Sequence, residues 1–96
     1  MTNKEIKEFE NDMRLAPLFK QFKTLQWVFG AIEKDIGKVK KGTDEFEEIC
    51  LRQFSVVKQI VRIADAINKI LEKYNAPQWN GVFLDQCRSW IEVEVA

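Results

Sequence analysis

Apolar residues recur at alternating intervals of four and three positions through the first half of the chain. This rhythm continues unbroken from residue 18 to residue 39, and it is typical of a helix face that packs along a second helix. Its members are Leu18, Phe22, Leu25, Phe29, Ile32, Ile36 and Val39. Pro17 suits the first turn of this helix, and Gly42 supplies a left-handed residue that ends it. We therefore predict a helix over residues 17–41.

A second, longer apolar pattern begins directly afterwards. Thr43 or Asp44 is the expected N-cap, because a side-chain oxygen there accepts a hydrogen bond from an otherwise unpaired amide. The pattern runs to Tyr74, and Pro77 disfavours helical geometry in the residue before it. We predict a helix over residues 44–74, about 45 Å long. The short turn between the two helices implies an antiparallel hairpin.

Two shorter helices are expected to flank this hairpin. Thr2 and Glu5 have the spacing of a capping box and predict an N-terminal helix over about residues 3–14. The expected final helix has Phe83, Leu84, Cys87, Trp90 and Ile91 on one face. Its closing residues, 91–95, fit either a frayed helix end or a strand that joins a partner's sheet. The chain is thus predicted to be one all-α domain over residues 1–96, a small helical bundle built on the long hairpin.

The longer helix of the hairpin carries more apolar surface than one antiparallel neighbour covers. Either the terminal helices cover the surplus, or a second copy of the chain does so through a two-fold contact. We favour a homodimer, because each terminal helix is less than half as long as the hairpin. The predicted self-association residues are Ile60, Ile63, Ile67, Ile70 and Tyr74. Asn68 lies within the apolar surface, where it either fixes register or is wetted at one edge.

The opposite side of the first hairpin helix is unusual for a solvent-facing surface. We call this set the back face: Lys23, Trp27, Gly30, Lys34, Gly37 and Lys41. Glycine within a helix costs about 1 kcal/mol relative to alanine, so two glycines in one stripe suggest the close approach of another backbone or a ligand. Tryptophan is typical of interfaces. The back face therefore predicts a docked protein, a bound anion, or cover by a terminal helix of the same chain.

Composition argues against most catalytic chemistry. The 96 residues include no histidine, which removes the usual general base near neutral pH and the commonest metal ligand. We find no glycine-rich phosphate loop and no cluster with metal-ligand spacing. Cys50 and Cys87 fall at apolar helix positions and are expected to be free thiols, with a disulfide as the alternative. We predict a protein that is not an enzyme and has no cofactor or metal.

Charge is balanced over the whole chain, with 15 basic and 15 acidic residues, so no net charge favours nucleic acid or a membrane surface. Locally the charge is segregated. Residues 17–42 hold six lysines against two carboxylates, and residues 43–55 hold four carboxylates against one arginine. No apolar run approaches the roughly 20 residues of a membrane span, and the N-terminus shows no secretion signal. These features predict a cytoplasmic protein.

The function that fits this pattern is a protein–protein interaction module, either an adaptor or an inhibitor of a partner protein, acting as a homodimer. The back face is the first predicted docking surface. The region of Trp79 and Trp90 is the second, because binding energy concentrates in tryptophan, tyrosine and arginine. The alternative function is binding of nucleic acid or a nucleotide-like anion through the lysines and the tryptophan of the back face.

Overall fold

The structure, a computed structural model, describes residues 14–95 of the chain. It contains three helices, α2 (Leu15–Ile36), α3 (Asp44–Lys73) and α4 (Val82–Val95), and no strand occurs among the described residues. The prediction of an all-α chain is therefore confirmed for this part of the protein. The predicted N-terminal helix over about residues 3–14 lies outside the described residues, apart from its last position.

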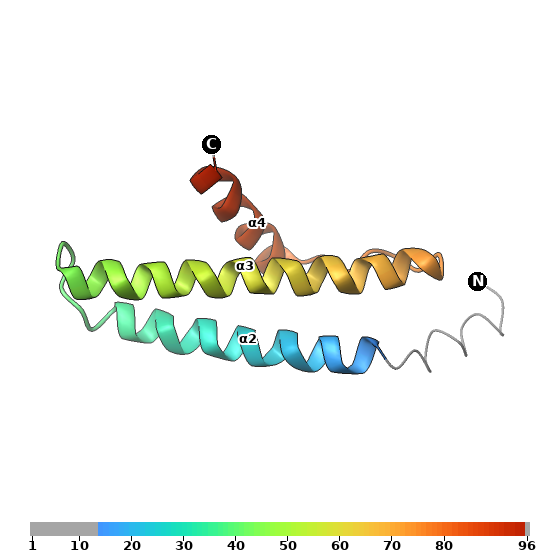
Figure 1. Ribbon diagram of the computed structural model, residues 1–96, viewed down its shortest axis with the longest axis horizontal. Helices are drawn as coiled ribbons and strands as arrows, with labels where there is room; N and C mark the ends of the chain where they lie inside the picture. The colour runs from blue at the N-terminus through green and yellow to red at the C-terminus, as the bar shows by residue number, and fades with distance from the viewer. Residues whose placement is uncertain (1–13, 96) are drawn as a thin grey trace.

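The three helices are arranged around α3, the longest of them. In Figure 1, α2 and α3 lie side by side and run in opposite directions, and α4 rises from the middle of α3 at an angle. Most tertiary contacts join α3 to α2, and a smaller set joins α3 to α4. Residues 91–95 continue α4, so they adopt the helical alternative and not the strand.

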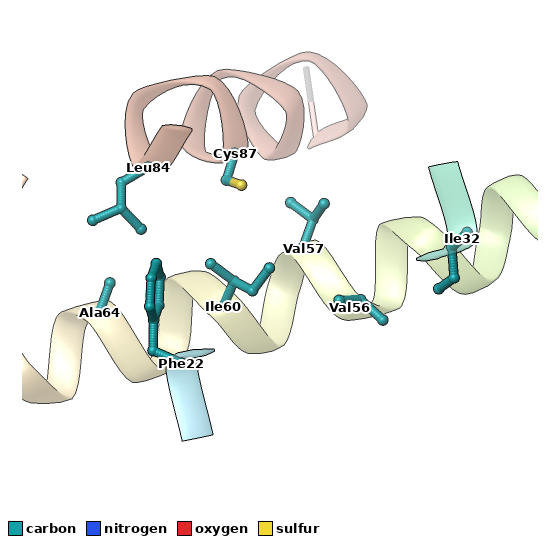
Figure 2. Close-up of a cluster of buried hydrophobic side chains, with 8 residues drawn as sticks. All are labelled: Phe22, Ile32, Val56, Val57, Ile60, Ala64, Leu84 and Cys87. Atoms are coloured by element: carbon teal, nitrogen blue, oxygen red, sulfur yellow. The ribbon is translucent and has the colours of Figure 1, made fainter. Parts of the chain in front are cut away.

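The main hydrophobic core lies where side chains from all three helices meet. Figure 2 shows its buried members, which are Phe22, Ile32, Val56, Val57, Ile60, Ala64, Leu84 and Cys87. A second buried cluster joins the start of α2 to the end of α3 and consists of Leu15, Ile67, Ile70 and Leu71. Aromatic rings of α2 and α4 also meet edge to face, with the centroids of Phe29 and Phe83 5.3 Å apart. The apolar series predicted from the sequence thus supplies the contact between helices.

α2 ends at Ile36, five residues before the predicted boundary. Gly37 still has helical dihedral angles and donates its backbone N–H to the carbonyl of Glu33 at 3.3 Å. Beyond it the chain turns, because glycine favours helix weakly and the lysines that follow repel one another. Gly42 has a φ of 86°, the left-handed conformation expected of it, but it lies within the turn and not directly behind the helix.

Both ends of α3 are closed by local hydrogen bonds. At the start, the hydroxyl of Thr43 accepts a hydrogen bond from the backbone N–H of Phe46 at 3.2 Å, so Thr43 is the N-cap. At the other end, Asn75 adopts a left-handed φ of 56°. The N–H of Ala76 then donates to the carbonyl of Leu71 at 2.9 Å, the outer bond of a Schellman motif. The helix therefore ends on its own hydrogen bonds before Pro77 is reached.

Candidate functional site

The back face remains open where it is carried by α2. Trp27 is 74% exposed, and the lysines on either side of it along the helix, Lys23 and Lys34, are also exposed. A Cβ added at Gly30 would meet no heavy atom of the described residues within 4 Å. Beside Trp27 lies a shallow hollow of about 260 Å³, lined by Gln26, Trp27, Gly30, Ala31 and Lys34. α4 therefore does not cover this surface.

The two distal members of the predicted back face belong to the turn that follows α2. Gly37 is the C-cap of the helix, and a Cβ there would lie 3.5 Å from the carbonyl oxygen of Lys34. Lys41 is exposed within the turn. The structure thus brings Lys23, Trp27, Gly30 and Lys34 together on one helix, and it does not place Lys41 on that helix.

Trp79 belongs to the packing of the chain. Its half-buried ring stands edge-on to two phenylalanine rings of α2, with centroid distances of 5.2 Å to Phe19 and 4.5 Å to Phe22. The part of the second predicted docking surface that rests on Trp79 is therefore turned toward α2.

Asn68 holds Trp79 in this position through the backbone. Its side-chain Oδ1 accepts the N–H of Trp79 at 2.6 Å, and its Nδ2 donates to the carbonyl of the same residue at 3.1 Å. Gln78 adds a longer bond of 3.4 Å from Nε2 to the carbonyl of Asn68. The side chain of Asn68 is thus fully engaged within one chain, where it ties the α3–α4 connection to α3. Sequence reasoning missed this role, because the two residues are 11 positions apart and no local pattern links them.

Trp90 occupies an intermediate position between core and surface. The centroid of its ring lies 6.4 Å from that of Phe29 and 6.3 Å from that of Phe54. It also lines an apolar hollow of about 320 Å³, which we call the α3–α4 groove. The residues that line the groove are Phe46, Glu47, Cys50, Leu51, Phe54 and Trp90. Sequence reasoning missed this surface, although Trp90 was among its candidates.

The isoleucine stripe predicted for self-association is largely covered within one chain. Ile60 and Ile67 have no exposed surface, and Ile70 is 7% exposed. Ile63 and Tyr74 are half-buried against the core clusters. Three of the five predicted contact residues are therefore buried within one chain, Ile60 in the main core and Ile67 and Ile70 in the second cluster.

The remaining chemistry of the described residues is limited. Both cysteines are free thiols, and burial of Cys87 raises the pKa of its thiol, an effect that the nearby Arg88 partly opposes. Among the residues that the structure describes, no group of three or more acidic or cysteine side chains has the geometry to hold a metal ion. None of the described helices is both long enough and apolar enough to cross a membrane.

No protein-family model, curated protein or solved structure matches this chain. The described residues leave several surface hollows open. Besides the hollow of the back face and the α3–α4 groove, one of about 390 Å³ is lined by Lys20, Gln21, Thr24, Leu25, Gln59 and Ile63. The back face and the groove differ from it in carrying a large apolar side chain that is mostly exposed, Trp27 and Leu51 respectively.

Proposed function

We propose that this chain is a non-enzymatic protein-docking module, an adaptor or an inhibitor, whose primary surface is the open part of the back face. The observation that carries the proposal is the exposure of Trp27, 74% of whose surface faces solvent beside the open position of Gly30. A large aromatic ring left in water is costly, and tryptophan is enriched at the centres of protein interfaces. A partner that covers the ring recovers this hydrophobic free energy.

The arrangement of charge around Trp27 favours a protein over a nucleic acid. Lys23 lies about 6 Å along the helix axis on one side of Trp27, and Lys34 lies about 10 Å on the other. Between them the hollow is lined by Trp27, Gly30 and Ala31, with Gln26 as its uncharged polar residue. An apolar centre with a charged rim is the usual composition of a protein interface. A single-stranded nucleic-acid site instead needs a continuous basic groove that follows the backbone, and the exposed Glu33 and Asp35 interrupt the basic residues at this end of α2.

A photo-crosslinking amino acid at position 26, next to Trp27, tests the proposal. In an extract of the source cells, a defined crosslinked partner is expected from position 26. The matched control is position 62, which is exposed on α3 and should yield no such product. Trp27→Ala should abolish the crosslink and weaken binding about thirtyfold or more, which corresponds to about 2 kcal/mol.

Two results would contradict the proposal. One is a crosslink from position 26 that survives Trp27→Ala. The other is a Trp27→Ala variant that loses its helical circular dichroism, since the ring would then be needed for folding. The alternative function, binding of a nucleic acid or a nucleotide-like anion, predicts instead an affinity that falls steeply as salt rises. Titration at two salt concentrations distinguishes the two functions.

A further inference from the structure

The α3–α4 groove is a place where apolar side chains remain uncovered within the chain. Where α4 packs against α3, Val57 has no exposed surface and Cys87 is buried. Toward its C-terminal end α4 diverges from α3, as Figure 1 shows. On the first half of α3, Leu51 is consequently 70% exposed and Phe54 is half-buried. The groove thus continues the packing surface of α3 past the buried contact at Cys87, and Trp90 is the residue of α4 that lines it.

The charged residue that lines the groove is opposite in sign to the one that lines the hollow of the back face. Four carboxylates cluster at this end of α3, all of them exposed: Asp44, Glu45, Glu47 and Glu48. Glu47 lines the groove itself. The opposing basic groups on this half of the helix are Arg52 and Lys58, and the ammonium group of Lys58 lies over the Phe54 ring, 4.6 Å from its centroid. The wider surroundings are mixed, because Lys38, Lys40 and Lys41 precede this cluster and Glu33 and Asp35 flank Lys34. The charges that line the two hollows themselves are opposite, Glu47 in the groove and Lys34 on the back face.

The two surfaces also have two features in common. Each combines a protruding apolar side chain with a hollow next to it. On the back face, Trp27 protrudes beside the hollow of about 260 Å³ at Gly30. At the groove, Leu51 protrudes beside the hollow of about 320 Å³ that Trp90 lines. Two such surfaces interlock when each side chain enters the hollow of the other.

We propose that the partner of the back face is a second copy of this chain, with Trp27 of one copy in the α3–α4 groove of the next and Leu51 of that copy against Gly30. This inference rests on the proposed function, since it uses the same surface and names its partner. Lys34 and Lys23 then face the carboxylates around the groove. The contact joins two different surfaces, and the back face points away from α3 whereas the groove lies on α3. Copies therefore associate head to tail, as chains or rings.

Light scattering of mixed variants tests this assembly. The wild-type mean mass should rise at least about twofold over about a hundredfold increase in protein concentration. Trp27→Ala removes the inserted ring, and Leu51→Lys places a like charge opposite the lysines, so each variant alone should remain monomeric. Each retains the surface that the other lacks, and an equimolar mixture should therefore form a dimer that grows no further. Val82→Ser is the matched control, because Val82 is 76% exposed and lies outside both surfaces; it should assemble as the wild type does.

Charge reversal supplies a second set of variants at exposed positions that folding does not need. Lys34→Glu and Glu47→Lys should each weaken assembly at least about tenfold, and combining both in one chain should restore it. The proposal is overturned if the wild type is monomeric throughout, if the single variants assemble normally, or if the mixture of Trp27→Ala and Leu51→Lys does not dimerise. A monomeric wild type that still gives the Trp27-dependent crosslink would overturn self-docking alone. A monomeric wild type that gives no Trp27-dependent crosslink would overturn both self-docking and the proposed function.

Discussion

The two halves of α3 are both rich in apolar residues, but the rest of the chain covers them differently. In the second half, Ile67 is fully buried between the start of α2 and the segment that carries Trp79. In the first half, Leu51 is 70% exposed, and Cys50 is half-buried in an open groove. The difference shows that one continuous apolar pattern is fully buried only where other segments cover its whole width, since Val56 and Val57 of the first half are buried while Leu51 is not.

Two tryptophans illustrate the same contrast. Trp79 packs edge-on against two phenylalanine rings and is fixed by hydrogen bonds to its backbone. Trp27 is 74% exposed on α2. One side chain packs within the fold and the other lies at the surface, although both belong to the same residue type.

Two buried amides of α3 complete the comparison. Asn68 is 9% exposed, and both polar atoms of its side chain are hydrogen-bonded. Gln53 is 4% exposed, and its Nε2 has no hydrogen-bond partner among the described residues. A buried amide without a partner costs about 1–3 kcal/mol. The buried amide in the second half of α3 therefore has its hydrogen bonds, whereas the one in the first half lacks a partner for its nitrogen.

Exchange of each tryptophan for alanine should give the largest contrast. Trp79→Ala should lower the free energy of unfolding by about 3 kcal/mol, because it empties the space between the phenylalanine rings of α2. Trp27→Ala should change it by less than about 0.5 kcal/mol. Urea unfolding followed by circular dichroism measures both values. Equal destabilisation by the two variants would show that the comparison is wrong.

Removal of the Asn68 side chain should have the next largest effect. Asn68→Ala deletes two hydrogen bonds and leaves the backbone N–H and carbonyl of Trp79 without partners, so a loss of about 2 kcal/mol is expected. Gln78→Ala, which removes only the 3.4 Å bond to the carbonyl of Asn68, is the control and should cost less than about 0.5 kcal/mol. Urea midpoints of the two variants provide the measurement. If they were indistinguishable, Asn68 would not hold the connection in place.

Replacement of Gln53 should have the smallest effect and the opposite sign. Gln53→Leu removes the unpaired amide and keeps an apolar side chain of similar length, so it should stabilise the protein by about 1 kcal/mol. Gln59→Leu is the matched control, because Gln59 is exposed on the same helix and the change should be nearly neutral. Thermal and urea unfolding both report the difference. A clear loss of stability in Gln53→Leu would indicate that the amide nitrogen has a partner in solution.

The sequence by itself determined the elements that depend on near neighbours along the chain. The four-and-three rhythm predicts the helices and the faces that they bury. The sequence also limits the N-cap of α3 to Thr43 or Asp44, and the structure selects Thr43, whose hydroxyl accepts a hydrogen bond from the N–H of Phe46. The end of α2 was misplaced by five residues. At that point Gly37 and the lysines weaken the helix, and Val39, the last member of the apolar series, is half-buried in the turn that follows.

Only the tertiary structure decided which apolar surfaces are covered. The bond between Asn68 and Trp79 joins residues 11 positions apart, and the burial of Ile60 requires α2 and α4 to reach the same stretch of α3. The exposure of Trp27 and the opening of the α3–α4 groove depend equally on where α4 crosses. Helical periodicity states which face of a helix is apolar, because it reflects a single helix axis. It does not state what lies against that face, because this depends on the path of the whole chain.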